Sequence, residues 1–296
     1  MAGPLPFDIR DVVAIDVHAH VEVSNSGGDH LTPELRSAAA RYFRASIELP
    51  TATALAEYYR ARRMMVVVFP VDSELTTGMP RIPNSEVMAA AAAHPDVLIP
   101  FASIDPRRGA DGVAEARDLI DAGRVRGFKF HPNLQQFHPN DRLAYPFYDL
   151  IEQAGLVALF HTGHSGIGAG LPGGGGIRLK YSNPMEVDDV AVDFPRMTII
   201  LAHPSFPWQD EALSVAMHKP QVAIDLSGWS PRYFPPILVQ YAKTLLRDQM
   251  LFGSDFPLIK PERWIEDFKA LDFDDDTQRL ILKGNAVRVL SLEGTA

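Results

Sequence analysis

The chain of 296 residues predicts an α/β fold, a single (β/α)₈ or TIM barrel, for three reasons. Short apolar runs rich in β-branched residues recur, and most are nearly continuous in apolar residues, as strands covered on both faces of a parallel sheet are. Helix-like stretches alternate with these runs. Polar residues end many of the runs, whereas a doubly wound open sheet usually has one ligand crevice at a switch point.

Each element follows from a local pattern. The apolar runs that predict strands lie at residues 12–21, 64–70, 97–105, 125–132, 155–163, 197–205, 221–229 and 250–257. The helix-like stretches lie at 51–63, 85–94, 109–123, 144–155, 183–195, 209–220 and 235–248, and 281–296 is expected to form a closing helix with a frayed end. Gly or Pro near several helix ends is typical punctuation. With no internal repeat or domain boundary, residues 1–296 are expected to form one domain.

Two segments depart from the alternation. Residues 22–50 form a long polar insertion after the first predicted strand, and residues 166–184, GIGAGLPGGGGIRLKYSNP, follow the fifth. The glycines of the second segment suit a flexible linker. The same segment stands where a barrel carries its active-site loops, so a substrate lid is the other interpretation.

The composition is that of a globular protein, with 46% hydrophobic and 22% charged residues. A formal net charge of -9 argues against nonspecific binding to nucleic acid and against an anionic membrane surface as a partner. An anionic substrate stays open, because charges in a pocket can oppose the global sign. We therefore expect a small-molecule substrate, and the sequence leaves the oligomeric state open, a homo-oligomer included.

The chain has no cysteine, so any metal site must use nitrogen and oxygen ligands. Its first residues, MAGPLPFDIRD, lack the basic start and apolar core of a signal peptide. No apolar run approaches the roughly 20 residues that span a bilayer. The expected location is a reducing cytoplasm.

The first predicted strand carries two histidines in the run VVAIDVHAHVEV. Side chains two apart on a strand point to the same side, so His18 and His20 are expected about 6.5–7 Å apart on one face. That separation lets one ion lie between the two imidazoles. Two surface histidines on an edge strand would give the same pattern.

Polar side chains at the other strand ends favour the metal site. Lys129 and His131 end the fourth run, His161 the fifth, His203 the sixth and Asp255 the eighth. In a barrel these ends converge on one face, where the active site is built. Burying so many imidazoles without a shared ion would cost several kcal/mol in desolvation.

These motifs resemble the metal-dependent amidohydrolase superfamily. The chain is similar, over nearly its whole length, to the branch of that superfamily related to aminocarboxymuconate semialdehyde decarboxylase. The similarity lies in the short motifs GFKFHP, FHTG, AHPSFPW, LFGSDFP and KGNAVRVL. That branch contains decarboxylases, hydratases and hydrolases, so the resemblance does not name the reaction.

The resemblance implies one divalent ion bound by His18, His20, His161 and Asp255. Three imidazoles and a carboxylate suit Zn²⁺, with Mn²⁺ as the alternative. His203 would then stand beside the metal as a proton donor, acceptor or electrophile.

Lys129 has two interpretations under the same resemblance. A carbamylated lysine could bridge a second metal ion, or an ammonium could bind a substrate carboxylate or oxyanion. The one-metal arrangement is preferred.

Such a site predicts hydrolysis of a small carbonyl substrate, with Asp255 taking a proton from water and His203 and Lys129 assisting at the developing negative charge. The bond is a C–C, ester or thioester bond, for example in a β-keto acid derivative. The alternatives are metal-dependent non-oxidative decarboxylation of an aromatic or enol carboxylic acid, and a catalytically silent metal-binding barrel.

Further side chains are candidates for substrate contact or support. Arg178 and Lys180 are expected to face a substrate carboxylate, unless they are solvated charges. Trp208, with Phe206, is expected to wall a planar substrate, unless it packs under a loop, and Trp229 is a similar case. The remaining histidines of these motifs, His131 and His164, are expected in supporting or surface positions.

Overall fold

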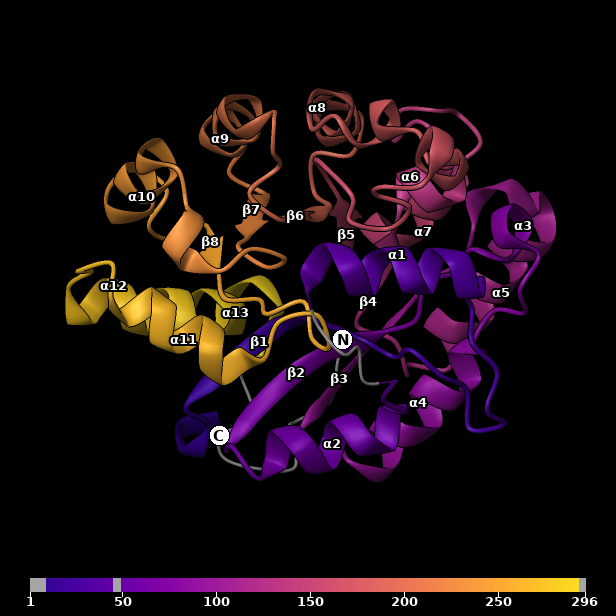
Figure 1. The fold of residues 1–296 in the computed structure, drawn as a ribbon, viewed down its shortest axis with the longest axis horizontal. Helices are drawn as coiled ribbons and strands as arrows, with labels where there is room; N and C mark the ends of the chain where they lie inside the picture. Colours follow the sequence, from indigo (N-terminus) through magenta and orange to yellow (C-terminus); the bar gives the residue numbers. More distant parts are fainter. Residues whose placement is uncertain (1–8, 45–48, 293–296) are drawn as a thin grey trace.

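The computed structural model describes residues 9–44 and 49–292. Eight parallel strands pair in sequence order, each with the next along the chain (Figure 1). The strands are β1 (Ala14–His20), β2 (Met64–Phe69), β3 (Leu98–Ala102), β4 (Gly127–Phe130), β5 (Val157–His161), β6 (Thr198–Ala202), β7 (Val222–Asp225) and β8 (Met250–Leu251). Each lies inside a predicted run, which confirms the barrel fold.

Backbone hydrogen bonds between the β8 segment and β1 close the barrel. The amide of Val17 donates to Phe252 at 2.9 Å, and the amide of His20 donates to Phe256 at 2.8 Å. The amide of Asp255 donates to the carbonyl of His18 at 3.0 Å. Because of this pairing, the ends of the first and last strands lie side by side, and residues more than 230 positions apart meet.

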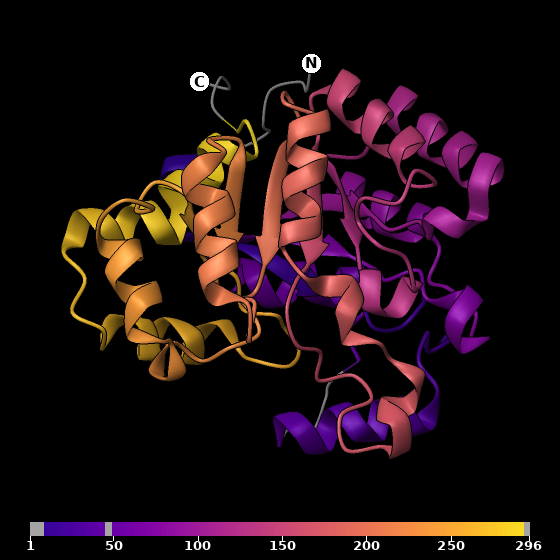
Figure 2. The same ribbon diagram turned by 90° about the horizontal axis from the view of Figure 1, so that it is seen from above.

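Helices surround the strands, as Figures 1 and 2 show. They are α1 (Pro33–Phe43), α2 (Ala52–Arg60), α3 (Glu74–Thr77), α4 (Asn84–Ala93), α5 (Gly109–Asp121), α6 (Pro132–Gln135), α7 (Tyr145–Ala154), α8 (Met185–Asp193), α9 (Gln209–His218), α10 (Pro236–Lys243), α11 (Pro261–Lys269), α12 (Asp275–Arg279) and α13 (Asn285–Val289). A π-helical turn, Leu280–Gly284, joins the last two. The predicted helices between strands and the closing helix are therefore present.

Strand residues alternate between two buried layers. In β2, Met65, Val67 and Phe69 fill the barrel interior, whereas Met64, Val66 and Val68 pack toward the helices. Both sets are nearly inaccessible to solvent. This explains the continuous apolar runs, because each face of the sheet is covered.

The insertion after β1 contains helix α1, which the polar composition of residues 22–50 did not reveal. Thr32 caps its N-terminus by accepting a hydrogen bond from the Leu35 amide, and the helix buries Leu35, Ala38 and Ala39. Figure 2 shows α1 beside the 166–184 loop, apart from the barrel wall. The loop approaches closely: a Cβ at Gly166 would stand 2.5 Å from the Phe43 ring.

Some sequence-based expectations fall outside the described residues. These are residues 1–8, in the segment that lacks signal-peptide features, residues 45–48, in the polar insertion at 22–50, and residues 293–296, in the expected frayed end. Among the helices that are described, none has the length and apolar character needed to cross a membrane.

Candidate metal centre and active site

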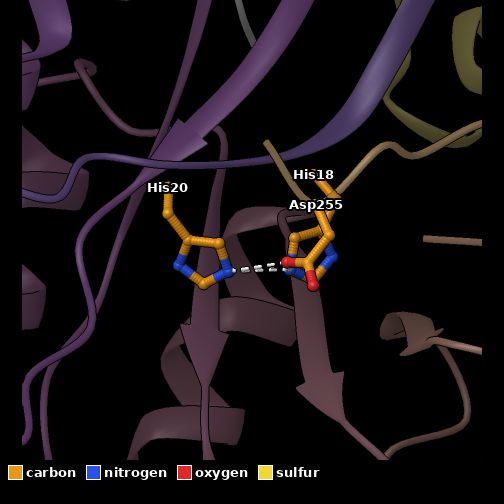
Figure 3. Close-up of side chains that lie close together, drawn as sticks. All are labelled: His18, His20 and Asp255. Atoms are coloured by element: carbon orange, nitrogen blue, oxygen red, sulfur yellow. Dashed lines mark hydrogen bonds and ion pairs between the residues drawn. The ribbon is translucent and has the colours of Figure 1, made fainter. Parts of the chain in front are cut away.

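Three predicted ligands meet at the carboxyl ends of β1 and β8. The Nε2 atoms of His18 and His20 are 3.2 Å apart. Oδ1 of Asp255 lies 3.3 Å from the first and 3.0 Å from the second. Figure 3 shows the two imidazoles and the carboxylate converging. They form a group whose ligand atoms all lie within 4.8 Å of one another.

The spacing of these atoms fits a small divalent ion. Zn–N bonds of about 2.0–2.1 Å in a tetrahedron place neighbouring ligand atoms about 3.3 Å apart, close to the separations in the trio. The donor set of two imidazoles and a carboxylate also suits Zn²⁺ or Mn²⁺. The residues therefore fit the metal that the sequence predicted.

Asp225, at the end of β7, fixes the orientation of His18. Its Oδ2 lies 2.5 Å from His18 Nδ1, and both groups are fully buried. A carboxylate there accepts the Nδ1 proton, which leaves the Nε2 lone pair directed at His20 and Asp255. The Ser227 hydroxyl also donates to Asp225, at 3.0 Å. Asp225 was not singled out from the sequence, because it lies inside the run 221–229 that was predicted as a strand.

Asp16 ties β1 to the β8 segment. Its Oδ1 accepts from the amides of His18 and Ser254 at 3.0 and 2.9 Å, and its Oδ2 accepts from the Tyr59 hydroxyl at 2.7 Å. The β1–β2 pairing also shifts register between Asp16 and Ala19. Such irregularities re-aim side chains near active sites.

His161 lies in the same cavity but outside the close trio. His203 Nδ1 lies 3.1 Å from the carbonyl of Ser227, which can only accept, so Nδ1 of a neutral His203 carries the proton. His203 Nε2 then accepts from His161 Nδ1 at 3.0 Å. This leaves His161 Nε2 unprotonated, and that atom is buried without a partner. An unprotonated, unmatched nitrogen is suited to a metal, so the predicted role of His161 as fourth ligand stays a prediction.

Lys129 is fully buried beside the ligands. Its Nζ lies 3.4 Å from His18 Nε2 and 5.1 Å from the centre of the Phe69 ring. Burial lowers the pKa of Lys129 to about 8, although Asp255 and Asp225 oppose that shift. An ammonium with this pKa is still mostly protonated at pH 7.

Burial sets the charges of the other groups. It lowers the pKa of His18 well below its ordinary value, with Lys129 adding to the effect. It lowers the pKa of His203 to about 4 despite the opposing charge of Asp255. Burial raises the pKa of Asp255, but the hydrogen bond from His20 and nearby positive charge outweigh it, so the net shift is downward. Neutral imidazoles and an ionised carboxylate are the forms that bind a cation.

The backbone is strained where two functional side chains stand. His203 and Asp255 have φ angles of 77° and 67°, in the left-handed region that non-glycine residues rarely adopt. Gly228 faces both: a Cβ there would stand 2.6 Å from His203 Nδ1 and 3.2 Å from Asp255 Oδ2. The β7 loop must therefore carry glycine at this position.

We expect Gly228→Ala to lower kcat about 10²-fold, because a displacement of about 1 Å at a catalytic group has that effect. Steady-state kinetics and circular dichroism would measure rate and fold. Gly123→Ala is the matched control, since Gly123 also has a positive φ, of 64°, but open space around its Cβ position. Equal rates for both variants and the wild type would contradict the argument.

A cavity of about 70 Å³ contains His20, Lys129, His161, His203 and Asp255 in its wall. The insertion after β1 completes that wall with residues that the sequence did not single out: Glu22, His30, Leu31, Arg36, Ala39, Tyr42 and Phe43. Arg36 pairs with Glu22 and, at 2.6 Å, with Asp29. A polar insertion gave no sequence signal for these contacts because they depend on how α1 folds back over the barrel.

Of the side chains predicted to contact the substrate, some line the cavity and others lie outside it. Trp229 lines the cavity. Arg178 and Lys180 are exposed, and neither is among the residues that line this cavity. Trp208 is half-buried before α9 and is likewise absent from that wall. The structure therefore does not bring these three side chains to the metal centre.

Several solved structures have a fold similar to that of this chain. The solved structure of an uncharacterised TIM-barrel protein from Bordetella bronchiseptica is 26% identical, with a TM-score of 0.75 over 94% of this chain and 98% of that one. 5-Carboxyvanillate decarboxylase from Sphingomonas paucimobilis is 14% identical, with a TM-score of 0.61 over 95% and 99%. A probable 2-pyrone-4,6-dicarboxylic acid hydrolase from Acinetobacter baumannii is 18% identical, with a TM-score of 0.60 over 95% and 100%.

The comparison with curated proteins gave no match. The sequence model of the amidohydrolase family, however, matches residues 15–292, which include every strand except the first residue of β1. This agrees with the predicted barrel and with the resemblance noted from the strand-end motifs. The chain belongs to the amidohydrolase family.

Proposed function

We propose that this protein is a metal-dependent hydrolase that uses water to cleave a C–C, ester or thioester bond of a small carbonyl substrate, such as a β-keto acid derivative. The observation behind this proposal is that the two carboxylate oxygens of Asp255 face different neighbours. Its Oδ1 faces the two imidazoles, whereas its Oδ2 lies near Gly228 in the cavity wall. Oδ1 can therefore bind a metal ion while Oδ2 accepts and later donates a proton.

His18, His20 and Asp255 would hold the ion, with His161 as the predicted fourth ligand. A bound divalent ion supplies Lewis acidity, which acidifies water and polarises a carbonyl oxygen. Hydrolysis suits the ionised Asp255, because a carboxylate can accept the proton of the attacking water and later deliver it to the leaving group.

Lys129 and His203 would assist bond cleavage with their own side chains. The buried Lys129 ammonium is placed to stabilise an oxyanion or a departing enolate, since positive charge in a site shielded from water interacts strongly with developing negative charge. With its Nδ1 proton directed at the carbonyl of Ser227, His203 would take up a proton at Nε2, and only when the hydrogen bond that Nε2 accepts from His161 Nδ1 breaks. These groups assist cleavage without a second metal, and a Lys129-bridged second ion is the less favoured arrangement.

Non-oxidative decarboxylation is the second candidate, for an aromatic or enol carboxylic acid. Phe43 and Trp229 line the cavity and would suit a flat ring, and Lys129 could bind a carboxylate. A structural neighbour is a decarboxylase of an aromatic acid, 5-carboxyvanillate. The same ligands serve both reactions.

Turnover in ¹⁸O-labelled water separates the two reactions. With a panel of aryl β-keto esters and hydroxybenzoates, we expect label in a product carboxylate, which mass spectrometry would detect. Release of CO₂ with solvent hydrogen on carbon, and no label in the organic product, would replace hydrolysis with decarboxylation. Variants that lack Asp255 provide the background for both readouts.

A further inference from the structure

His131 is a cavity residue whose polar atoms the metal centre does not use. It follows β4 two positions after Lys129 and is 4% exposed. Its ring lies parallel to that of His161, with the ring centres 4.0 Å apart and the planes 9° apart. His161 in turn contacts His203, and His203 contacts His18, so His131 is at one end of a continuous row of imidazoles.

The main chain of His131 is firmly held. Its amide donates to Gln135 Oε1 at 2.7 Å, and its carbonyl accepts from the Gln135 amide at 2.8 Å. The Gln135 side-chain amide donates to the carbonyl of Asp72 at 3.2 Å. The position of the imidazole is therefore fixed by β4 and α6, and does not depend on bonds made by the ring.

The ring itself is unmatched. Its Nδ1 is buried without a hydrogen-bond partner among the described residues. A neutral imidazole has one donor and one acceptor, and a buried polar group normally finds a partner because leaving it unmatched costs stability. The ring lines the cavity that holds the metal ligands, so a bound molecule can supply the missing partner.

We propose that His131 is a substrate-binding residue whose imidazole hydrogen-bonds a second oxygen of the substrate, a keto or hydroxyl oxygen close to the reacting carboxyl or carbonyl group. The preferred substrates are then β-keto compounds or ortho-hydroxy aromatic acids rather than simple esters or acids. The proposal rests on the proposed chemistry only in placing the reacting group at the metal trio.

A purely structural role would make the ring a flat support for His161. Two substitutions separate the roles. His131→Phe keeps a planar ring against His161 but removes both nitrogens. His131→Asn keeps polar donor and acceptor atoms but removes the stacked ring. Loss of an oxygen-specific contact should appear in the first variant and be partly rescued in the second.

The experiment is calorimetric titration of the zinc-loaded protein with benzoate and with 2-hydroxybenzoate. We expect the wild type to prefer 2-hydroxybenzoate by about 5-fold or more, the increment of one hydrogen bond. His131→Phe should bind benzoate as the wild type does but lose the preference, and His131→Asn should recover part of it. His94→Phe, remote from the cavity, is the matched control.

An unchanged preference in His131→Phe would overturn the proposal, because metal chelation by both oxygens would then explain it. Loss of zinc in that variant, with equal weakening of both acids, would assign His131 a structural role instead. A wild type that binds neither acid, or both equally, would also overturn it. Binding needs no turnover, so failure of the ¹⁸O test leaves this result interpretable.

Discussion

Asp255→Asn is expected to reduce turnover by about 10⁴-fold or more, below the detection limit of most assays. The amide has nearly the shape of the carboxylate, and asparagine tolerates the left-handed backbone that Asp255 adopts, with φ of 67°. It cannot accept a proton from water, however, and its charge is lost beside two imidazoles. The expected loss is therefore chemical rather than a failure to fold.

Steady-state rates and metal content by mass spectrometry would test this together with two companion variants. His18→Ala and His161→Ala should also abolish turnover, and both should lower the amount of bound metal. Asp276→Asn is the control, because Asp276 is an exposed carboxylate in α12. If all three site variants kept full metal and full rate, the metal centre would lie elsewhere.

Measurement of the metal content would also show whether the site holds one ion or two. Protein purified without added metal is expected to carry about one ion per chain. Two ions would make Lys129 a bridging ligand and remove the ammonium on which the stabilisation of an oxyanion depends.

The fold and the positions of His18, His20 and Asp255 could be predicted from the sequence because both follow from the repeated alternation of strands and helices. Covered parallel strands leave continuous apolar runs, and a barrel directs every strand end to one face. His18, His20 and Asp255 therefore had to be near one another once the strands were placed in order. The hydrogen bonds between β1 and the β8 segment make this proximity a direct contact.

The supporting contacts could not be predicted in the same way. Asp16 and Asp225 were not singled out from the sequence, because each accepts hydrogen bonds across the sheet from positions far away in sequence. Arg36 reaches the cavity only because α1 folds over the barrel opening. In the other long segment, Arg178 was expected at the substrate on the basis of loop position alone, but it is exposed and does not line the cavity.

His203→Asn is expected to lower kcat by 10²–10⁴-fold while the protein keeps its metal, the range for a lost acid–base group. His203 has a φ of 77°, which asparagine accepts, so the local backbone should persist. Its Nδ1 lies 3.1 Å from the carbonyl of Ser227, and its Nε2 lies 3.0 Å from His161 Nδ1. The substitution removes the ring that makes both contacts.

The measurement pairs kcat with metal content, because the two separate catalysis from ligation. His218→Asn is the control, since His218 is an exposed histidine at the end of α9. Complete loss of metal in His203→Asn would make His203 a ligand. That result would also change the role of His161, because His203 Nε2 would no longer be the acceptor that holds the His161 Nδ1 proton. Retained metal with a reduced rate would instead leave His161 Nε2 as the ligand atom and His203 as the proton-transferring neighbour.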